Sequence, residues 1–268
     1  MSIFKLAACG APSPLSDMLT VQRAMALFID PDHYVFLQSL PSTVWACVPG
    51  CELTKVCDWI QTNANGKGCY FGINPIAEEI VKPSRVADVS YRRWILIDVD
   101  RNKTLCPDDS ASENEHEDAK ELTFEIHSYL SDIGFPAPIQ VDSGNGFHLY
   151  YRVDLPNDKF NRDLVHGFLK ILDNTFSCSK GNVGTEVFDA RRISRIPGTW
   201  ARRGMATKER QYRQATLMYA PKEIEIVPAE LLWKVVDAKA HEQKEKKANL
   251  FEVKVEHLND TREKAYGR

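Results

Sequence analysis

The stretch Trp94-Ile-Leu-Ile-Asp98-Val-Asp100 places an apolar run directly before two closely spaced acids. We expect a buried strand over about residues 93–99, with Asp98 and Asp100 on one face because strand side chains alternate with a period of two. Two neighbouring carboxylates repel each other unless a cation stabilises them, and carboxylate oxygens suit Mg²⁺ or Mn²⁺. A polar strand end without a metal is the alternative for this motif taken alone.

A second motif separates two runs of strand-forming residues, at 139–141 and 147–153, and reads Val141-Asp-Ser143-Gly144-Asn-Gly146-Phe-His148. This pattern predicts a hairpin. Its two glycines would let the backbone approach a ligand, and its serine would add a hydroxyl, which suits phosphate oxygens. His148 lies just inside the second strand, beside the turn. An ordinary hairpin with a surface histidine is the alternative, since no Lys-Ser/Thr pair follows to make a P-loop.

The third motif reads Gly184-Thr-Glu186-Val-Phe-Asp189-Ala-Arg191-Arg192-Ile-Ser-Arg195-Ile-Pro197-Gly198-Thr199. We expect a strand over 187–196 that ends at the Pro-Gly turn. Residues 191–213 carry eight bases against one acid, with Trp200 and Tyr212 nearby. Arginine binds phosphate bidentately, and phosphate neutralisation supplies most nonspecific affinity for nucleic acids, so a polyanion partner is favoured. A charged edge strand is the alternative.

Composition places the chain among ordinary folded proteins. Of its 268 residues, 43% are apolar and 26% are charged, the net charge is -3, and no apolar stretch approaches the length of a membrane span. The seven cysteines form no repeated CxxC pair, which is typical of reduced thiols in a cytoplasmic protein. Cys47, Cys51, Cys57 and Cys69 cluster in sequence but fit no standard zinc ribbon, so buried free cysteines are favoured over a zinc site.

Hydrophobic periodicity completes the predicted elements. Helical spacing occurs over residues 16–30, 53–62, 119–130, 160–176 and 228–236. Further strands are expected over 44–48, 70–74 and 214–219. Residues 108–118 carry six acids and no base, and we expect an acidic loop there.

In this order, the three motifs resemble those of the archaeo-eukaryotic primase superfamily, in particular the primase-polymerases of plasmids, phages and mobile elements. The resemblance spans about residues 70–199. It implies an α+β fold with a catalytic core over 1–227, in which an N-terminal αβ unit (about 1–90) packs on a unit with an RNA-recognition-motif-like antiparallel sheet (about 91–227). The active site would lie between them. Residues 228–268 would form a helical, charged extension or linker.

The resemblance also implies roles for individual residues. Asp98 and Asp100 would be catalytic, and His148 would contact the phosphates of the incoming nucleotide. The third motif departs from the family because Gly184 stands where many members have an aspartate. Some phage-type members use Gly-x-Glu instead, so we expect Glu186 as the third carboxylate, on the Gly184 face of the strand, with Asp189 in reserve.

The function implied is a DNA primase-polymerase that joins NTPs or dNTPs on a single-stranded DNA template, in the replication of a plasmid, phage or mobile element. Two Mg²⁺ or Mn²⁺ ions would be held by Asp98, Asp100 and Glu186. The nucleotide would be bound by Ser143, Gly144, Gly146, His148, Arg192 and Arg195. Template phosphates would be bound by Arg202, Arg203 and Arg210. A helicase domain or a replication protein would be a further partner, with no membrane involved.

Two other functions stay open. If neither acid of the third motif reaches the metal, the chain would be a weak or inactive primase-like module that binds single-stranded DNA. A rolling-circle replication nuclease is more distant, because it needs a metal-binding His-x-His and none of the seven histidines has that spacing.

Overall fold

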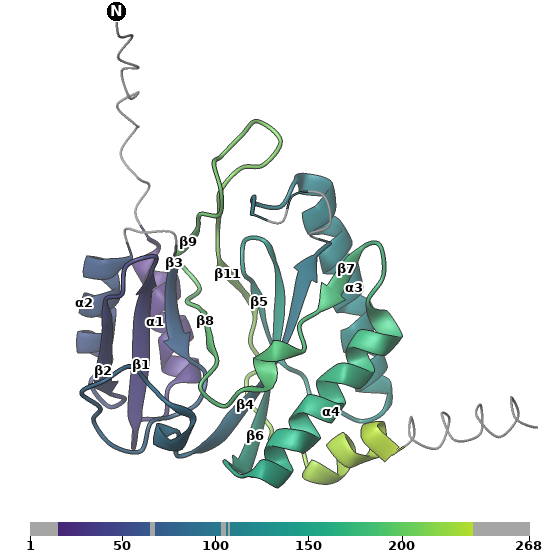
Figure 1. Ribbon diagram of the computed structural model, residues 1–268, viewed down its shortest axis with the longest axis horizontal. Coiled ribbons are helices and arrows are strands. Elements are labelled where there is room, and N and C mark those ends of the chain that lie inside the picture. Colours follow the sequence, from purple (N-terminus) through teal and green to yellow (C-terminus); the bar gives the residue numbers. More distant parts are fainter. Residues whose placement is uncertain (1–15, 65–67, 103–105, 107, 238–268) are drawn as a thin grey trace, which may run out of the picture.

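Two antiparallel sheets share one hydrophobic core in the structure, a computed structural model that describes residues 16–64, 68–102, 106 and 108–237 (Figure 1). The predicted mixed α+β architecture is confirmed. Within these ranges no helix is both long and apolar enough to cross a lipid bilayer. Most of the predicted charged extension lies outside the described residues, which end with a helix at 229–237.

The first sheet has the strand order β2-β1-β3-β8. Its strands are β1 (Tyr34–Leu40), β2 (Trp45–Pro49), β3 (Gly68–Gly72) and β8 (Ile193–Arg195), and helices α1 (Met18–Phe28) and α2 (Leu53–Asn63) accompany it. Asp17 caps α1 by accepting hydrogen bonds from the N–H groups of Leu19 and Thr20. Because β8 comes from far along the chain, this sheet is not formed by residues 1–90 alone.

The second sheet has the order β11-β5-β6-β4-β7 and packs against two helices (Figure 1). Its elements are β4 (Tyr91–Arg101), α3 (Glu113–Asp132), β5 (Ile139–Asp142), β6 (Gly146–Pro156), α4 (Lys159–Phe176), β7 (Gly181–Val183) and, at the edge, β11 (Thr216–Tyr219). Without β11 this is a βαββαβ unit with the order β5-β6-β4-β7, the arrangement of an RNA-recognition motif. The predicted RNA-recognition-motif-like unit is confirmed.

Short elements link the two sheets. They are the 3-10 helices η1 (Val86–Asp88) and η2 (Glu186–Phe188) and the paired strands β9 (Trp200–Ala201) and β10 (Arg213–Gln214). The predicted strand over 214–219 is therefore divided. Gln214 belongs to β10, whereas Thr216–Tyr219 forms β11 and pairs with β5.

An aromatic cluster centred on Phe28, at the end of α1, joins the two sheets. The Phe28 ring centroid lies 5.0 Å from that of Phe71 in β3. It lies 4.6 Å from that of Tyr150 in β6 and 5.5 Å from that of Trp94 in β4. All four rings are buried. Aromatic pairs at such spacings contribute about 0.5–1.5 kcal/mol beyond area burial, so this cluster fixes how the sheets meet.

The acidic segment after β4 differs from the prediction of a loop. Helix α3 begins at Glu113, because Ser112 and Glu115 form a capping box. The Ser112 hydroxyl accepts from the Glu115 N–H, and the Glu115 carboxylate accepts from the Ser112 N–H. Most of the acidic run therefore lies in the first turns of a helix, where negative charge is favourable.

The predicted strand over 187–196 is wrong in its first half. Residues Glu186–Phe188 form η2, and only Ile193–Arg195 pairs, with β3. The Asp189 carboxylate accepts a hydrogen bond from the Arg191 N–H, and the Asp189 carbonyl accepts one from the Arg192 N–H. Such a local turn competes with strand pairing. The sequence pattern also does not predict β1, whose nearly continuous apolar run lacks alternation.

Two phenylalanines on α4 allow a test of the packing. Phe168 is fully buried and lies 5.7 Å from Phe135, centroid to centroid, whereas Phe160 on the same helix is 62% exposed. We expect Phe168→Ala to lower the free energy of unfolding by about 3–5 kcal/mol, because it removes buried apolar area and leaves a cavity. Phe160→Ala should cost below about 1 kcal/mol. Urea denaturation of both variants measures this difference, and equal losses would contradict the described core.

Candidate active site

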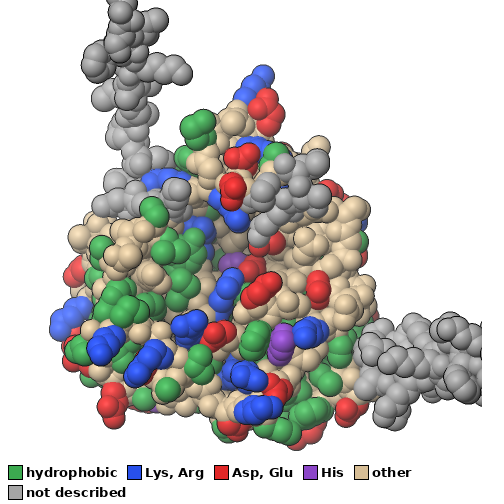
Figure 2. Space-filling view, in the orientation of Figure 1, with side chains coloured by type: hydrophobic (Ala, Val, Ile, Leu, Met, Phe, Trp, Pro, Cys, Tyr) green, Lys and Arg blue, Asp and Glu red, His purple; other side chains and the backbone are tan. Residues whose placement is uncertain are grey.

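A pocket of about 720 Å³ opens where the two sheets meet, and Figure 2 shows basic side chains along this hollow. Its acidic lining residues are Asp98, Asp100 and Asp108. Its basic lining residues are His148, Arg192, Arg195, Arg202 and Arg203. The pocket therefore combines residues from β4, the β5–β6 hairpin, β8 and the segment after β9.

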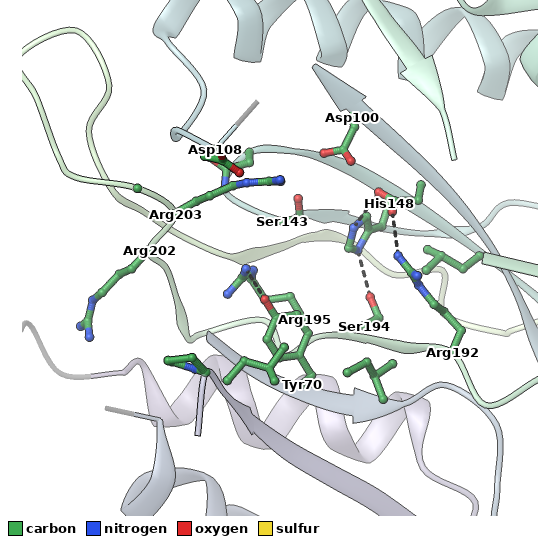
Figure 3. A pocket seen from close by; sticks show the side chains of 17 residues that line it. Tyr70, Asp100, Asp108, Ser143, His148, Arg192, Ser194, Arg195, Arg202 and Arg203 are labelled. Atoms are coloured by element: carbon green, nitrogen blue, oxygen red, sulfur yellow. Dashed lines mark hydrogen bonds and ion pairs between the residues drawn. The ribbon is translucent and has the colours of Figure 1, made fainter. Parts of the chain in front are cut away.

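Asp98 and Asp100 lie on one face of β4, as predicted. In the pairing of β4 with β6, Asp98 is opposite His148 and Asp100 is opposite Gly146. The His148 Nε2 lies 3.3 Å from Asp98 Oδ1, and the Arg192 Nη2 lies 3.6 Å from Asp98 Oδ2 (Figure 3). Two bases thus already face one carboxylate of the pair, so repulsion between the acids is not the only force on Asp98.

The hairpin turn uses its polar groups internally. The Ser143 hydroxyl donates to the Gly146 carbonyl at 2.9 Å, and the Gly144 N–H donates to Asp142 Oδ1 at 2.7 Å. Gly144 has a φ of +89°, and a Cβ at Gly146 would lie 2.2 Å from the Val99 carbonyl oxygen. These glycines therefore permit the turn and its close approach to β4. Ser143 lines the pocket, whereas neither glycine is among its lining residues.

Both acids of the third motif lie outside this pocket. Glu186 begins η2, is exposed, and lines a neighbouring hollow of about 340 Å³ together with Asp189. Asp189 is paired with Arg191, at 3.2 Å from Nε to Oδ2. The alternation that favoured Glu186 requires a regular strand, which is absent here. Among the described residues, no group of three or more His, Cys, Asp or Glu side chains is placed to hold a metal ion.

Gly184 lies directly beside the acidic pair. Its N–H donates to the Asp98 carbonyl at 2.8 Å. A Cβ at this position would lie 3.5 Å from the Asp98 Cβ and 3.6 Å from its Oδ2, which is ordinary van der Waals contact. Gly184, the position at which the motif resemblance leads us to expect an aspartate, is thus adjacent to Asp98, but this chain places no side chain there.

Arg195 and Arg192, both predicted to bind the nucleotide, differ in how they are held in the protein. The Arg195 guanidinium lies 4.8 Å from the Tyr70 ring centroid and donates to the Tyr70 hydroxyl at 2.7 Å and to the Trp200 carbonyl at 3.1 Å. The Arg192 Nε is buried and has no hydrogen-bond partner in the described part of the chain. A buried donor of this kind is suited to an anionic ligand.

The arginines after β9 separate into two groups. Arg203 points toward the acidic pair, whereas Arg202 extends away from it (Figure 3). Arg210 instead donates to both carboxylate oxygens of Glu115, at 2.6 and 2.9 Å, and to the Ser110 carbonyl at 2.7 Å. Arg210, predicted to bind DNA, therefore anchors its loop to the start of α3.

Asp108 is the pocket residue that sequence reasoning missed. It follows β4 and lies near Arg203, which comes from the opposite side of the pocket (Figure 3). The six acids within residues 108–118 were the available indication. The sequence predicts an acidic loop there, because nothing in the spacing of these acids shows that the chain folds back over the strand end.

No protein-family model and no curated protein matches the chain. Its fold is similar to the crystal structure of primase RepB', with a TM-score of 0.49 and 13% identity over 88% of this chain and 68% of that one. For the catalytic domain of primase RepB' in complex with initiator DNA, the TM-score is 0.46 at 12% identity, over 84% of this chain and 98% of that one.

A polymerase domain is also similar. It is that of Mycobacterium tuberculosis Ligase D in complex with DNA, with a TM-score of 0.46 and 13% identity over 82% of this chain and 86% of that one. At such identities the likeness assigns no role to any residue.

The anchor between Arg210 and Glu115 gives a prediction for acid stability. Burial alone would raise the pKa of Glu115, but hydrogen bonds from Arg210 and the Ser112 N–H, with the charge of Arg101, outweigh burial and lower the pKa from 4.5 to about 2. The folded-state pKa lies below the unfolded one, so this stabilisation is complete above about pH 4.5 and is lost as the pH falls toward about 2.

Glu115→Gln should therefore lower the free energy of unfolding at pH 7 by about 1–3 kcal/mol, because it removes a charged hydrogen-bond acceptor. It should also flatten the fall in stability between about pH 4.5 and about 2. Urea denaturation over a pH series measures both effects. Glu113→Gln is the matched control. Glu113 lies on the same helix turn as Glu115 and pairs with Arg213, but its side chain is 84% exposed. If the stability of Glu115→Gln fell as steeply below about pH 4.5 as that of the wild type, the lowered pKa of Glu115 would be contradicted.

Proposed function

We propose that this chain is a DNA primase-polymerase that joins nucleotides on a single-stranded DNA template, in the replication of a plasmid, phage or mobile element. One observation carries the proposal: paired carboxylates on β4 lie in the same pocket as a histidine and four arginines. Nucleotidyl transfer needs acidic groups for divalent ions and basic groups for the triphosphate, side by side.

The acidic pair fits a divalent metal ion in ligand type. Asp98 and Asp100 present carboxylate oxygens from one strand face, and such oxygens are the preferred ligands of Mg²⁺ and Mn²⁺. These two residues would hold the metal. A bound ion would supply charge stabilisation at the phosphoryl group. The pair fits better than the predicted set of three, because Glu186 lies in the neighbouring hollow.

The basic side chains of the pocket would have different roles in binding the nucleotide and the template. The buried donor of Arg192, the imidazole of His148 and the guanidinium of Arg203 would bind the triphosphate beside the acids. Arg195 is held against Tyr70 and Trp200, so it would shape the wall of the pocket. Arg202, which extends away from the acids, would meet the phosphates of the template. This arrangement moves Arg203 from the template set to the nucleotide set.

A second function has a specific observation in its favour. In the described residues the predicted third carboxylate is not assembled with the pair. A primase-like module that binds nucleotide and single-stranded DNA with little or no synthesis would need only the basic half of the pocket. The two functions differ in whether labelled nucleotide is incorporated.

Metal-dependent incorporation of labelled nucleotide on primed and unprimed single-stranded templates tests the proposal. We expect Asp98→Asn and Asp100→Asn each to lower incorporation at least about a hundredfold, because a metal-held carboxylate contributes several kcal/mol to the transition state. Asp154→Asn is the matched control, since Asp154 lies on β6, is 42% exposed and pairs with Arg152 outside the pocket. If Asp98→Asn and Asp100→Asn both keep incorporation within tenfold of the wild type, the metal-site assignment is contradicted.

Gly184→Asp distinguishes a complete site from an incomplete one. The Cβ of an aspartate there would meet Asp98 at ordinary van der Waals distances, so this substitution would add a third carboxylate beside the pair. If the missing acid limits synthesis, incorporation should rise about tenfold or more, equivalent to about 1.4 kcal/mol of the barrier. Gly184→Asn is the control of equal size without charge. If Gly184→Asp leaves the rate of incorporation unchanged and Asp108→Asn abolishes incorporation, Asp108 already serves as the third acid.

A further inference from the structure

A buried chain of hydrogen bonds lies behind His148 and crosses from one sheet to the other. The Ser194 hydroxyl in β8 lies 2.6 Å from the Tyr150 hydroxyl in β6. The His148 Nδ1 lies 3.2 Å from the Tyr150 hydroxyl and 3.3 Å from the Ser194 hydroxyl. On its other side, His148 reaches Asp98. Tyr150, Ser194 and His148 are 0%, 3% and 6% exposed, so water does not compete freely for these groups.

The chemistry of the partners determines which nitrogen of a neutral His148 carries the proton. While the ring keeps the described orientation, the Nε2 that faces Asp98 must donate, because a carboxylate only accepts hydrogen bonds. Nδ1 is then the acceptor, and its two neighbours are hydroxyl groups that can donate. Burial raises the pKa of Tyr150 far above its ordinary value, so its hydroxyl keeps its proton.

The ring of Tyr150 has no freedom to turn away. It packs against Phe28 at 4.6 Å and edge-on against Trp94 at 6.4 Å, centroid to centroid, inside the cluster that joins the sheets. Its hydroxyl is therefore held by the core, and Ser194 is held by the pairing of β8 with β3. Each sheet thus places one hydroxyl beside the same imidazole nitrogen, and because one of the two hydroxyls donates to the other, one of them at a time donates to Nδ1.

We propose that Tyr150 and Ser194 are positioning residues that fix the ring of His148, with Nε2–H directed at Asp98 and the pocket. The positioning stands on the geometry alone, whereas its effect on catalysis rests on the proposed nucleotidyl transfer. Because Ser194 belongs to the other sheet, the imidazole is fully oriented only when the two sheets are seated as described. The histidine thereby links the seating of the sheets to nucleotide binding.

Nitrogen-15 NMR of the full chain labelled at histidine measures the tautomer of His148 directly, with His148→Gln to assign its resonance. At about pH 9, above the ordinary titration range of imidazole, the wild type should show the Nε2–H form. Tyr150→Phe or Ser194→Ala alone leaves one hydroxyl, so each should shift the population partly. The double variant should show a mixture of both tautomers, because neither hydroxyl then holds the ring. The single variant Ser194→Thr keeps a hydroxyl, so its His148 spectrum should match that of the wild type.

Tyr151→Phe is the matched control. Tyr151 is the next residue on β6, is 1% exposed, and its hydroxyl has no hydrogen-bond partner within the described ranges. We expect it to leave the His148 spectrum and the kinetics unchanged. The double variant at Tyr150 and Ser194 should lower kcat/KM for nucleotide about tenfold while the affinity for single-stranded DNA stays constant, because only the pocket histidine is displaced.

The outcomes separate the two proposals. A double variant that folds, as judged by its thermal transition, and keeps the wild-type His148 spectrum would overturn the positioning. If the wild type incorporates no nucleotide but the spectrum of the double variant still changes, the positioning stands and the proposed activity fails. Should the double variant not fold, the comparison of Ser194→Ala with Ser194→Thr decides by the same spectral criterion.

Discussion

The contact between Phe28 and Tyr150 is the interaction on which the candidate site depends. Phe28 belongs to the helix of the first sheet and Tyr150 to the second, and their rings are 4.6 Å apart in a buried cluster. The pocket is lined from both sheets, so its width follows from this packing. Tyr150 contributes to the core and to the candidate site, since its ring packs in the core and its hydroxyl contacts His148.

Charge balance explains why a pair of acids is tolerated at this position. Asp98 is approached by His148 and Arg192 on its two oxygens. Arg192 carries the opposite charge, and a carboxylate near a protein surface interacts with such a charge by about 4 kcal/mol at 4 Å, enough to offset repulsion from a neighbour. A divalent ion and a triphosphate would replace these internal partners with stronger ones. Under the proposed function, the same side chains would balance the charge of Asp98 within the protein and bind the phosphates of the nucleotide.

Short-range patterns predicted much of this fold because they report local constraints. The apolar run before Asp98, the hairpin around Ser143 and the periodicity of α4 each specify an element regardless of its neighbours. The pairing of β8 with β3 has no local pattern, so the sharing of the first sheet between distant segments could not be predicted. For the same reason Tyr70 and Ser194 enter the site without any indication in their own surroundings.

The third motif shows where local and long-range constraints conflict. Its residues have strand propensity, but the side chain of Asp189 bonds to the backbone that follows, and Val187 is drawn into the core. The resulting turn directs Glu186 away from the pocket, although its neighbour Gly184 stays bonded to the Asp98 carbonyl. The backbone thus keeps its contact with the acidic strand while the carboxylate is lost from the pocket. Under the proposed function the basic side chains for the triphosphate are already gathered in the pocket, so synthesis would depend on whether Asp98, Asp100 and Asp108 suffice to hold the metal.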